Sequence, residues 1–189
     1  MSSTLPRLLV VTVSTRPTRI GHLVADWFID QAKADMTWDV STADLRELAL
    51  PVFDEPFHPR MGNYQHEHTK RWSSIVAAAD AVVFVTPEYN YFAPAPLVNA
   101  MTYLANEWRD KPVGFVGYGS TGALRAIAAA KTLAGNLGMI PVVPVVPVNS
   151  FATVKDGVFT PDSFNDSAAP ALLAELARVL RASSALRSA

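Results

Sequence analysis

The stretch Ala81-Val-Val-Phe-Val-Thr-Pro-Glu-Tyr-Asn-Tyr-Phe92 decides the fold class of this chain. Its first five residues are apolar, which is typical of a strand buried on both faces of a parallel sheet. Proline has no N–H group to continue a ladder, so we expect the strand to stop at Thr86-Pro87. The residues after it would then form a loop at the carboxyl end of the strand, the edge where open α/β sheets bind ligands.

This loop, residues 88–92, offers aromatic rings and amide groups. Aromatic side chains pack on the faces of a flat ligand, and backbone or amide donors meet its polar rim. The same residues would also suit a tight turn whose rings pack inward. Taken alone, the loop is equally consistent with a binding site for a flat aromatic ligand and with such a turn.

The composition indicates one compact domain spanning residues 1–189, since half of the residues are hydrophobic and only 17% are charged. The net charge of −1 provides no basic field for nucleic acid. The chain contains no cysteine, which excludes disulfides, thiol catalysis and cysteine-ligated iron–sulfur clusters.

The N-terminus lacks the apolar core of a signal peptide. The apolar runs are far shorter than the roughly 20 residues that a membrane helix needs. We therefore expect a cytoplasmic protein without a membrane anchor. Residues 1–6 and 182–189 are expected to fray, as chain ends commonly do.

Four further segments have the pattern of strands, and amphipathic helices are expected between them. The strands are expected at residues 8–13, 37–45, 112–118 and 141–148. Proline cannot donate to a strand ladder, and Pro144 and Pro147 lie at positions that face opposite sides of one strand. Both therefore cannot occupy the solvent side, so the last strand should pair over a short length at an edge.

Five strands that alternate with helices predict a single α/β domain with a parallel sheet between two helical layers. The flavodoxin-like strand order 2-1-3-4-5 places the polar second strand and the proline-rich fifth strand at the two edges. That order also sets the loops after the first and third strands side by side, at the point where ligands bind in such folds.

The loop after the first strand is a candidate phosphate site. Ser14 and Thr18 offer hydroxyl groups, and Arg16 and Arg19 offer guanidinium donors. The following helix would add unpaired N–H groups at its N-terminus. The alternative is that both arginines are solvated charges beside a serine turn. The chain has neither a G-x-G-x-x-G fingerprint in this loop nor a P-loop elsewhere.

A third loop, Tyr118-Gly-Ser-Thr-Gly122, follows the fourth strand. Its glycines would let backbone N–H groups approach a ligand closely. Ser120 or Thr121 is also expected to act as the N-cap of the next helix. Glu88 could act as a general acid, although a solvated or helix-capping carboxylate is the simpler interpretation.

The histidines do not predict a metal site. His66 and His68 are two residues apart, so on a helix they would not share a face. No serine, histidine and aspartate arrangement for nucleophilic catalysis is evident, and we assign no catalytic acid or base.

Together the three loops resemble those of the NAD(P)H-dependent FMN reductases and quinone reductases of flavodoxin-like fold. The resemblance rests on Val13-Ser-Thr-Arg-Pro-Thr-Arg-Ile-Gly21, Thr86-Pro-Glu-Tyr-Asn90 and Tyr118-Gly-Ser-Thr-Gly122, and it extends over roughly residues 8–148. The chain departs from the family pattern at Val13, where the family often has glycine, and at Gly122-Ala123, where it often has two glycines.

The resemblance implies that the FMN phosphate is held by Ser14, Arg16 and the backbone around residues 19–21. It implies that residues 87–90 wrap the ribityl chain and ring, and that residues 119–121 meet the pyrimidine edge. The cofactor-binding residues predicted in this way are Ser14, Arg16, Thr18, Arg19, Ile20, Gly21, Pro87, Glu88, Tyr89, Asn90, Tyr118, Gly119, Ser120 and Thr121.

The resemblance also implies an enzyme that takes hydride from NADPH or NADH and reduces a small acceptor, such as free flavin or a quinone. Two alternatives are a flavodoxin-type electron carrier without enzymatic activity, and a domain that has lost its flavin and serves as an interaction module. The aromatic residues on loops and helix ends predict a homodimer, or a dimer of dimers, whose interface borders the flavin. They are Phe53, Phe57, Tyr64, Tyr91, Phe92 and Trp108.

Overall fold

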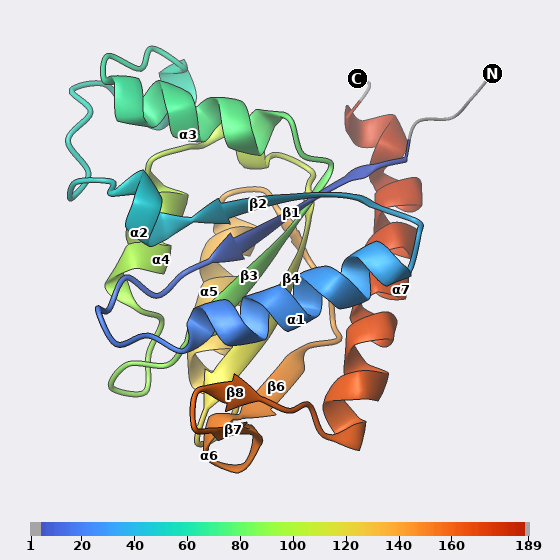
Figure 1. The fold of residues 1–189 in the computed structure, drawn as a ribbon. Helices are drawn as coiled ribbons and strands as arrows, with labels where there is room; N and C mark the ends of the chain where they lie inside the picture. The colour runs from blue at the N-terminus through green and yellow to red at the C-terminus, as the bar shows by residue number, and fades with distance from the viewer. Residues whose placement is uncertain (1–4, 188–189) are drawn as a thin grey trace.

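The computed structural model describes residues 5–187 and has three layers (Figure 1). A parallel sheet forms the middle layer. The helices α1 (Gly21–Ala34) and α7 (Ser163–Arg187) pack on one face of the sheet, and α3 (Glu67–Ala77), α4 (Ala95–Thr102) and α5 (Leu124–Asn136) pack on the other. This arrangement confirms the predicted flavodoxin-like fold class.

The sheet has the predicted strand order. Its strands are β1 (Arg7–Thr12), β2 (Asp39–Asp44), β3 (Ala81–Pro87), β4 (Pro112–Gly119), β5 (Ile140–Pro141) and β6 (Val146–Asn149). They run in the order β2-β1-β3-β4, and β5 and β6 both pair with β4 at the far edge. Every pairing is parallel, so the polar and the proline-rich strands lie at opposite edges as predicted.

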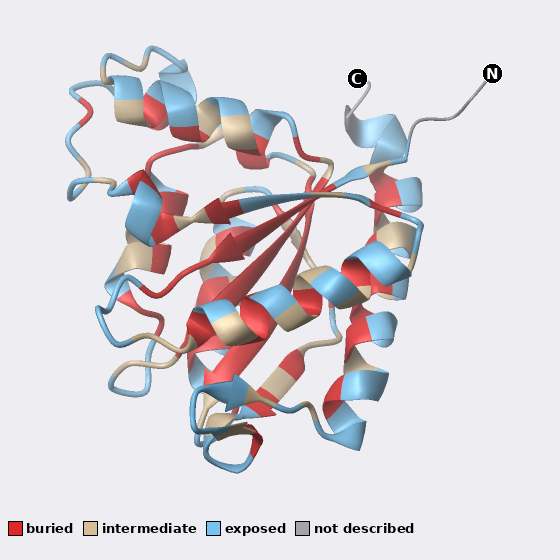
Figure 2. Cartoon of the chain, viewed as in Figure 1, coloured by how far each residue is buried: buried red, intermediate tan, exposed pale blue. Residues whose placement is uncertain are grey.

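Strand β3 is the buried centre of the sheet, and each of its residues is buried (Figure 2). Its side chains alternate between the two cores: Phe84 packs on the α3 and α4 side, whereas Val83 and Val85 pack on the α1 and α7 side. The strand ends at Pro87, opposite Tyr118 of β4, as the missing N–H of proline predicts.

The fifth strand is broken, and the single strand predicted at 141–148 is wrong in extent. The chain leaves the edge after Pro141 and rejoins β4 at Val146. The Lys131 ammonium donates to the carbonyl groups of Val142 and Val143 in the gap, at 2.6 and 3.0 Å, and burial lowers its pKa. The predicted short pairing at an edge is confirmed.

The long segment between β2 and α3 is fastened by side chains from elsewhere in the chain. It contains α2 (Leu45–Leu48) and the 3₁₀ turn η1 (Pro59–Met61). The Asn99 amide of α4 donates to the Pro51 carbonyl at 2.6 Å. The buried Glu55 carboxylate accepts the N–H groups of Gln65 and His66 at 2.8 and 3.1 Å, which are donors just ahead of α3.

The short elements that follow β6 were not predicted from the sequence. They are α6 (Ser150–Thr153), β7 (Val154–Lys155) and β8 (Val158–Phe159). The 3₁₀ turn η2 (Asn106–Trp108), which precedes β4, was not predicted either. The β7–β8 hairpin folds back over α1, since the Phe159 ring meets the edge of Trp27 with centroids 5.4 Å apart.

The last helix runs through Arg187, so the fraying expected from Ala182 is not observed up to that residue. The remaining predicted fraying at residues 1–4 and 188–189 lies outside the described residues. Within residues 5–187, no helix is long and apolar enough to cross a membrane.

Candidate functional site

A cavity of about 400 Å³ lies at the carboxyl ends of β1, β3, β4 and β6. Its lining comprises Ser14, Arg16, Thr18, Arg19, Ile20, Pro87, Glu88, Tyr89, Tyr118, Gly119, Ser120, Ser150 and Phe151. All predicted cofactor-binding residues except Gly21, Asn90 and Thr121 are among them. Ser150 and Phe151 were not predicted from the sequence, although their position just after the fifth strand could have indicated them.

The first and second loops meet, as the strand order predicted. The Ser14 and Tyr89 hydroxyl groups are hydrogen-bonded at 2.8 Å. The Arg16 guanidinium lies 6.0 Å from the centroid of the Tyr89 ring, within the range of a cation–π contact. Tyr89 is therefore held from the first loop, although it belongs to the loop after β3.

The two arginines of the first loop differ in their surroundings. Arg19 forms a bidentate ion pair with Asp44, with both N···O distances 2.6 Å, and donates to the Ser14 carbonyl at 2.9 Å. The Asp44 carboxylate raises the pKa of Arg19. This differs from the expectation that both guanidinium groups are available for a phosphate, because only Arg16 is exposed.

The N-terminus of α1 faces the cavity through Ile20, its N-cap residue. The Ile20 side chain cannot accept a hydrogen bond, and no side chain caps the helix at this position. The first N–H groups of a helix have no partner within it, and together with the helix dipole they favour an anion. This part of the predicted phosphate site is therefore present as a structural feature.

The loop after β3 is a tight hairpin turn with exposed rings. Tyr89 and Phe92 exchange two backbone hydrogen bonds, at 3.2 and 3.0 Å. The two residues between them, Asn90 and Tyr91, have positive φ values of 49° and 63°, as a type I′ turn requires. Tyr91 is 72% exposed and Phe92 60%, so these rings do not pack inward. The Arg125 guanidinium lies 4.9 Å from the Tyr91 ring centroid.

Glu88 is a helix-capping carboxylate. It accepts the N–H groups of Arg125 and Ala126, at 2.9 and 3.2 Å, and also the Arg125 guanidinium at 3.1 Å. These N–H groups belong to the first turn of α5. The capping interpretation of Glu88 is therefore confirmed, and its oxygens are committed to α5.

The third loop has the backbone freedom that its glycines predicted, but a different helix cap. Gly119, which lines the cavity, has a φ of 147°. The N-cap of α5 is Ala123, in the left-handed conformation with φ 56°. The prediction that Ser120 or Thr121 caps this helix is therefore wrong. The positive φ also gives a physical reason why glycine is common in the family at this position.

Tyr118 lies beneath the cavity with its side chain 5% exposed. Its hydroxyl is buried and has no hydrogen-bond partner within the described part of the chain. Burial raises the pKa of Tyr118; Tyr89 adds to the rise, whereas Ser14, Arg19 and Arg16 oppose it.

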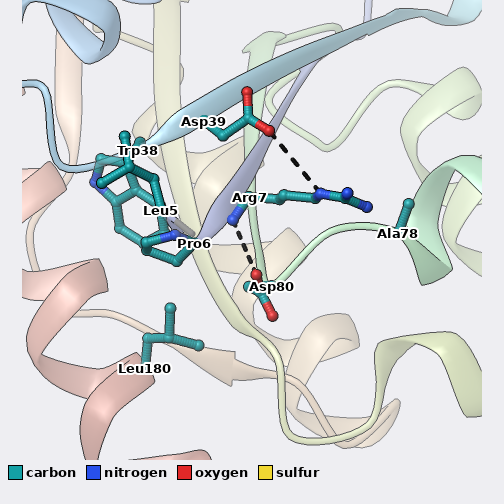
Figure 3. A pocket seen from close by; sticks show the side chains of 8 residues that line it. All are labelled: Leu5, Pro6, Arg7, Trp38, Asp39, Ala78, Asp80 and Leu180. Carbon is teal, nitrogen blue, oxygen red and sulfur yellow. Dashed lines mark hydrogen bonds and ion pairs between the residues drawn. The ribbon is translucent and has the colours of Figure 1, made fainter. Parts of the chain in front are cut away.

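A larger cavity, of about 770 Å³, lies at the opposite end of the strands (Figure 3). The Arg7 side chain crosses it, with its guanidinium 3.9 Å from the Asp39 carboxylate. The backbone N–H of Arg7 donates to the Asp80 carboxylate at 2.9 Å. None of the three sequence loops reaches this cavity. Ligands of open parallel sheets bind at the carboxyl edge, so the smaller cavity is the candidate site.

The His66 and His68 rings stack, and the helix spacing considered for them does not apply because only His68 lies on the helix. Their ring centroids are 5.1 Å apart and the planes differ by 10°, because His66 is the N-cap of α3 and lies outside the helix. His68 contacts the Asp54 carboxylate at 3.0 Å. Among residues 5–187, no group of three or more histidine, aspartate or glutamate residues could hold a metal ion.

The model of the NADPH-dependent FMN reductase family matches residues 6–153. The chain belongs to this family. The predicted family is thereby confirmed, as are the oxidoreductase class and the use of FMN with NAD(P)H at the level of the family.

Curated relatives in fungi are named NAD(P)H-dependent FMN reductases. An NAD(P)H-dependent FMN reductase of Schizosaccharomyces pombe is 40% identical over 134 residues, which are 70% of this chain and 67% of that protein. One from Nectria is 37% identical over 128 residues, 65% of this chain and 64% of the relative. The matched part thus spans about two thirds of each relative.

Solved structures share the fold at low sequence identity. A flavoenzyme NAD(P)H:(acceptor) oxidoreductase from Paracoccus denitrificans has a TM-score of 0.69 at 22% identity, covering 94% of this chain and 96% of that one. An oxidoreductase from Corynebacterium diphtheriae has a TM-score of 0.68 at 18% identity, covering 94% and 98%.

Proposed function

We propose that this member of the family holds FMN in the cavity at the carboxyl edge and passes reducing equivalents from NADPH or NADH to a small acceptor, such as free flavin or a quinone. The observation that carries the proposal is the convergence of the three loops, separated in the sequence, on one cavity. The family membership and the names of the fungal relatives support the same donor and cofactor.

The residues of the cavity fit the groups of FMN. A phosphate carries only acceptors at neutral pH, and the first loop provides donors: the exposed Arg16 and the uncapped N-terminus of α1. Beneath them lies the unpartnered Tyr118 hydroxyl. Tyr89 provides an aromatic ring, and Gly119 exposes its backbone without a side chain. When bound, FMN would supply the redox chemistry, and the protein would bind and orient it.

We assign no catalytic acid or base to the side chains around the cavity. The carboxylate of the second loop, Glu88, already accepts hydrogen bonds from three donor groups of α5. We therefore assign this chain the roles of binding the cofactor, orienting it and leaving one of its faces open to a substrate. A flavodoxin-type electron carrier is disfavoured by the net charge of −1, because such carriers dock through strongly acidic surfaces.

The absorption spectrum of the purified protein with FMN tests the proposal. We expect flavin bands shifted by binding, which bleach anaerobically when NADPH or NADH is added and return when a quinone or free flavin is supplied. Bound FMN that neither nucleotide bleaches would contradict the reductase and support the electron carrier. Absence of FMN binding would overturn both.

We further propose a homodimer whose interface borders the cavity. Tyr91 and Phe92 are exposed beside the cavity. An apolar groove of about 670 Å³ lies between α2 and α4, lined in part by Leu50 and Val98. A second copy that covered these groups would remove apolar surface from water.

The aromatic surface behind this proposal is smaller than the sequence suggested. Trp108 is fully buried in the core. Phe53 and Tyr64 are half-buried and pack against that core. Of the six rings, only Phe57, Tyr91 and Phe92 are exposed.

A further inference from the structure

The buried hydroxyl of Tyr118 is an unusual feature of the candidate site. A buried hydroxyl without a hydrogen-bond partner destabilises the folded protein, and phenylalanine would fill the same space without that cost. The Ser14 side chain lies close enough to lower the pKa of Tyr118, and its hydroxyl is hydrogen-bonded to Tyr89 at 2.8 Å. Within residues 5–187 the Tyr118 hydroxyl itself has no partner at hydrogen-bonding geometry, Ser14 included. The phenol therefore carries a donor that the described residues do not use.

The phenol lies against the first turn of α1. A Cβ atom built on Gly21 would come within 2.4 Å of the Tyr118 hydroxyl oxygen, so the first helical residue has room for the phenol only because it is glycine. Tyr118 stands opposite Pro87 in the sheet, and its ring extends from β4 to the first residue of α1. The hydroxyl is thus placed at the helix N-terminus.

The groups around this hydroxyl are donors or cations. They are the N-terminus of α1, the guanidinium groups of Arg16 and Arg19, and the hydroxyl groups of Ser14 and Tyr89, which can donate as well as accept. Arg19 is already paired with Asp44. A cluster of this kind suits a ligand that only accepts hydrogen bonds. The polar edge of a flavin ring presents both donors and acceptors, whereas a phosphate dianion presents acceptors alone.

We infer that Tyr118 is a phosphate ligand whose O–H donates to the phosphate of the bound cofactor, so that it selects FMN over riboflavin. This inference rests on the proposed function. It gives a specific role to Tyr118, which was predicted from the sequence only as one of the cofactor-binding residues of the third loop. The hydroxyl then gains its missing partner only when the phosphorylated flavin is bound.

Tyr118→Phe tests the assignment because it removes a single oxygen atom. Fluorescence titration should show FMN affinity reduced roughly ten- to hundred-fold, as for loss of a hydrogen bond to a charged group. Riboflavin affinity should stay as in the wild type. The melting temperature of the flavin-free variant should be at least as high as that of the wild type, since the lost hydroxyl has no hydrogen-bond partner among residues 5–187.

Tyr103→Phe is the matched control. Tyr103 is also fully buried, but its hydroxyl donates to the Asp54 carboxylate at 2.9 Å and to the Pro51 carbonyl at 3.1 Å. This variant should melt at a lower temperature and bind FMN with unchanged affinity. The two tyrosines are thus expected to show opposite combinations of stability and affinity.

Three results would overturn the assignment while leaving the proposed function intact. They are FMN affinity of Tyr118→Phe equal to that of the wild type, equal losses for FMN and riboflavin, or a fall in melting temperature like that of Tyr103→Phe. Failure of the wild type to bind FMN would instead overturn the proposed function, and the assignment with it.

Discussion

Arg16 and Arg19 show how neighbouring residues of one type differ in role. Arg19 has only 12% of its side chain exposed and is fixed by Asp44. Arg16 is exposed at the mouth of the cavity, close to the Tyr89 ring. The guanidinium of Arg19 uses its donors in the ion pair with Asp44, so few of them remain for a phosphate. Within this short loop Arg19 therefore has a structural role, and Arg16 remains available for binding.

Arg16→Ala is expected to weaken FMN binding and to leave riboflavin binding nearly unchanged. Loss of one charge-assisted contact corresponds to about 1.5–3 kcal/mol, or roughly ten- to a hundred-and-fifty-fold in affinity. Titrations with both flavins at matched salt measure the difference, since exposed charges are screened. Equal weakening for the two flavins would show that Arg16 has a structural role instead.

Arg19→Ala is the control for this prediction. It breaks a bidentate, partly buried ion pair, so the free energy of unfolding should fall by about 1–3 kcal/mol. Urea denaturation measures this loss. Arg16→Ala should leave the free energy of unfolding close to that of the wild type.

At the N-termini of two helices, α3 and α5, backbone N–H groups donate to carboxylates from other parts of the chain. Glu88, from the second loop, satisfies the first turn of α5. Glu55, from the long segment before α3, accepts the N–H groups of Gln65 and His66. In both cases a loop is fastened to a helix end, because carboxylates are favoured at the positive end of the helix dipole. The loop that borders the cavity is therefore coupled to α5.

Stability should fall at acidic pH, in part through Glu55. Burial alone would raise the pKa of Glu55, but hydrogen bonds from Gln65 and His66 lower it overall. A carboxylate with a lowered pKa in the folded state stabilises the protein above its unfolded pKa, and this stabilisation is lost as the pH falls through the folded value. The loss should therefore set in below the ordinary value of 4.5.

Glu55→Gln should lower the free energy of unfolding at neutral pH and make its decline toward acid shallower. Urea denaturation at a series of pH values measures both effects. Asp30→Asn is the control, because Asp30 is exposed on α1, and its profile should follow that of the wild type. A Glu55→Gln profile with the wild-type slope would exclude Glu55 as a source of the pH dependence.

At the scale of the whole molecule, the proposed homodimer predicts a solution mass of twice the chain. Light scattering at micromolar concentration measures it. Phe92→Asp should dissociate the dimer, because it places a charge in the proposed interface. Val158→Asp is the control: Val158 is 62% exposed on β8, and this variant should remain dimeric. A monomeric wild type would contradict the proposal.

The layers, the strand order and the location of the candidate site could be predicted from the sequence alone. The apolar run from Ala81 to Val85 specifies a strand buried on both faces, and Pro87 specifies its end, because both signals depend on neighbouring residues alone. The alternation of strands and helices then brings the loops after β1, β3 and β4 to one edge. That is why most of the predicted residues line one cavity.

Which polar groups around that cavity remain available to a ligand depends on the tertiary structure. Arg19 is hydrogen-bonded to Asp44, 25 positions away in the sequence, and Glu88 to Arg125, 37 positions away. The break after Pro141, covered by Lys131, and the approach of Phe151 to the cavity also depend on packing between distant segments. Local patterns encode periodicity and chain breaks. The partner of a side chain depends instead on which distant groups the folded chain places within hydrogen-bonding distance. For the Tyr118 hydroxyl, the described part of the chain provides none.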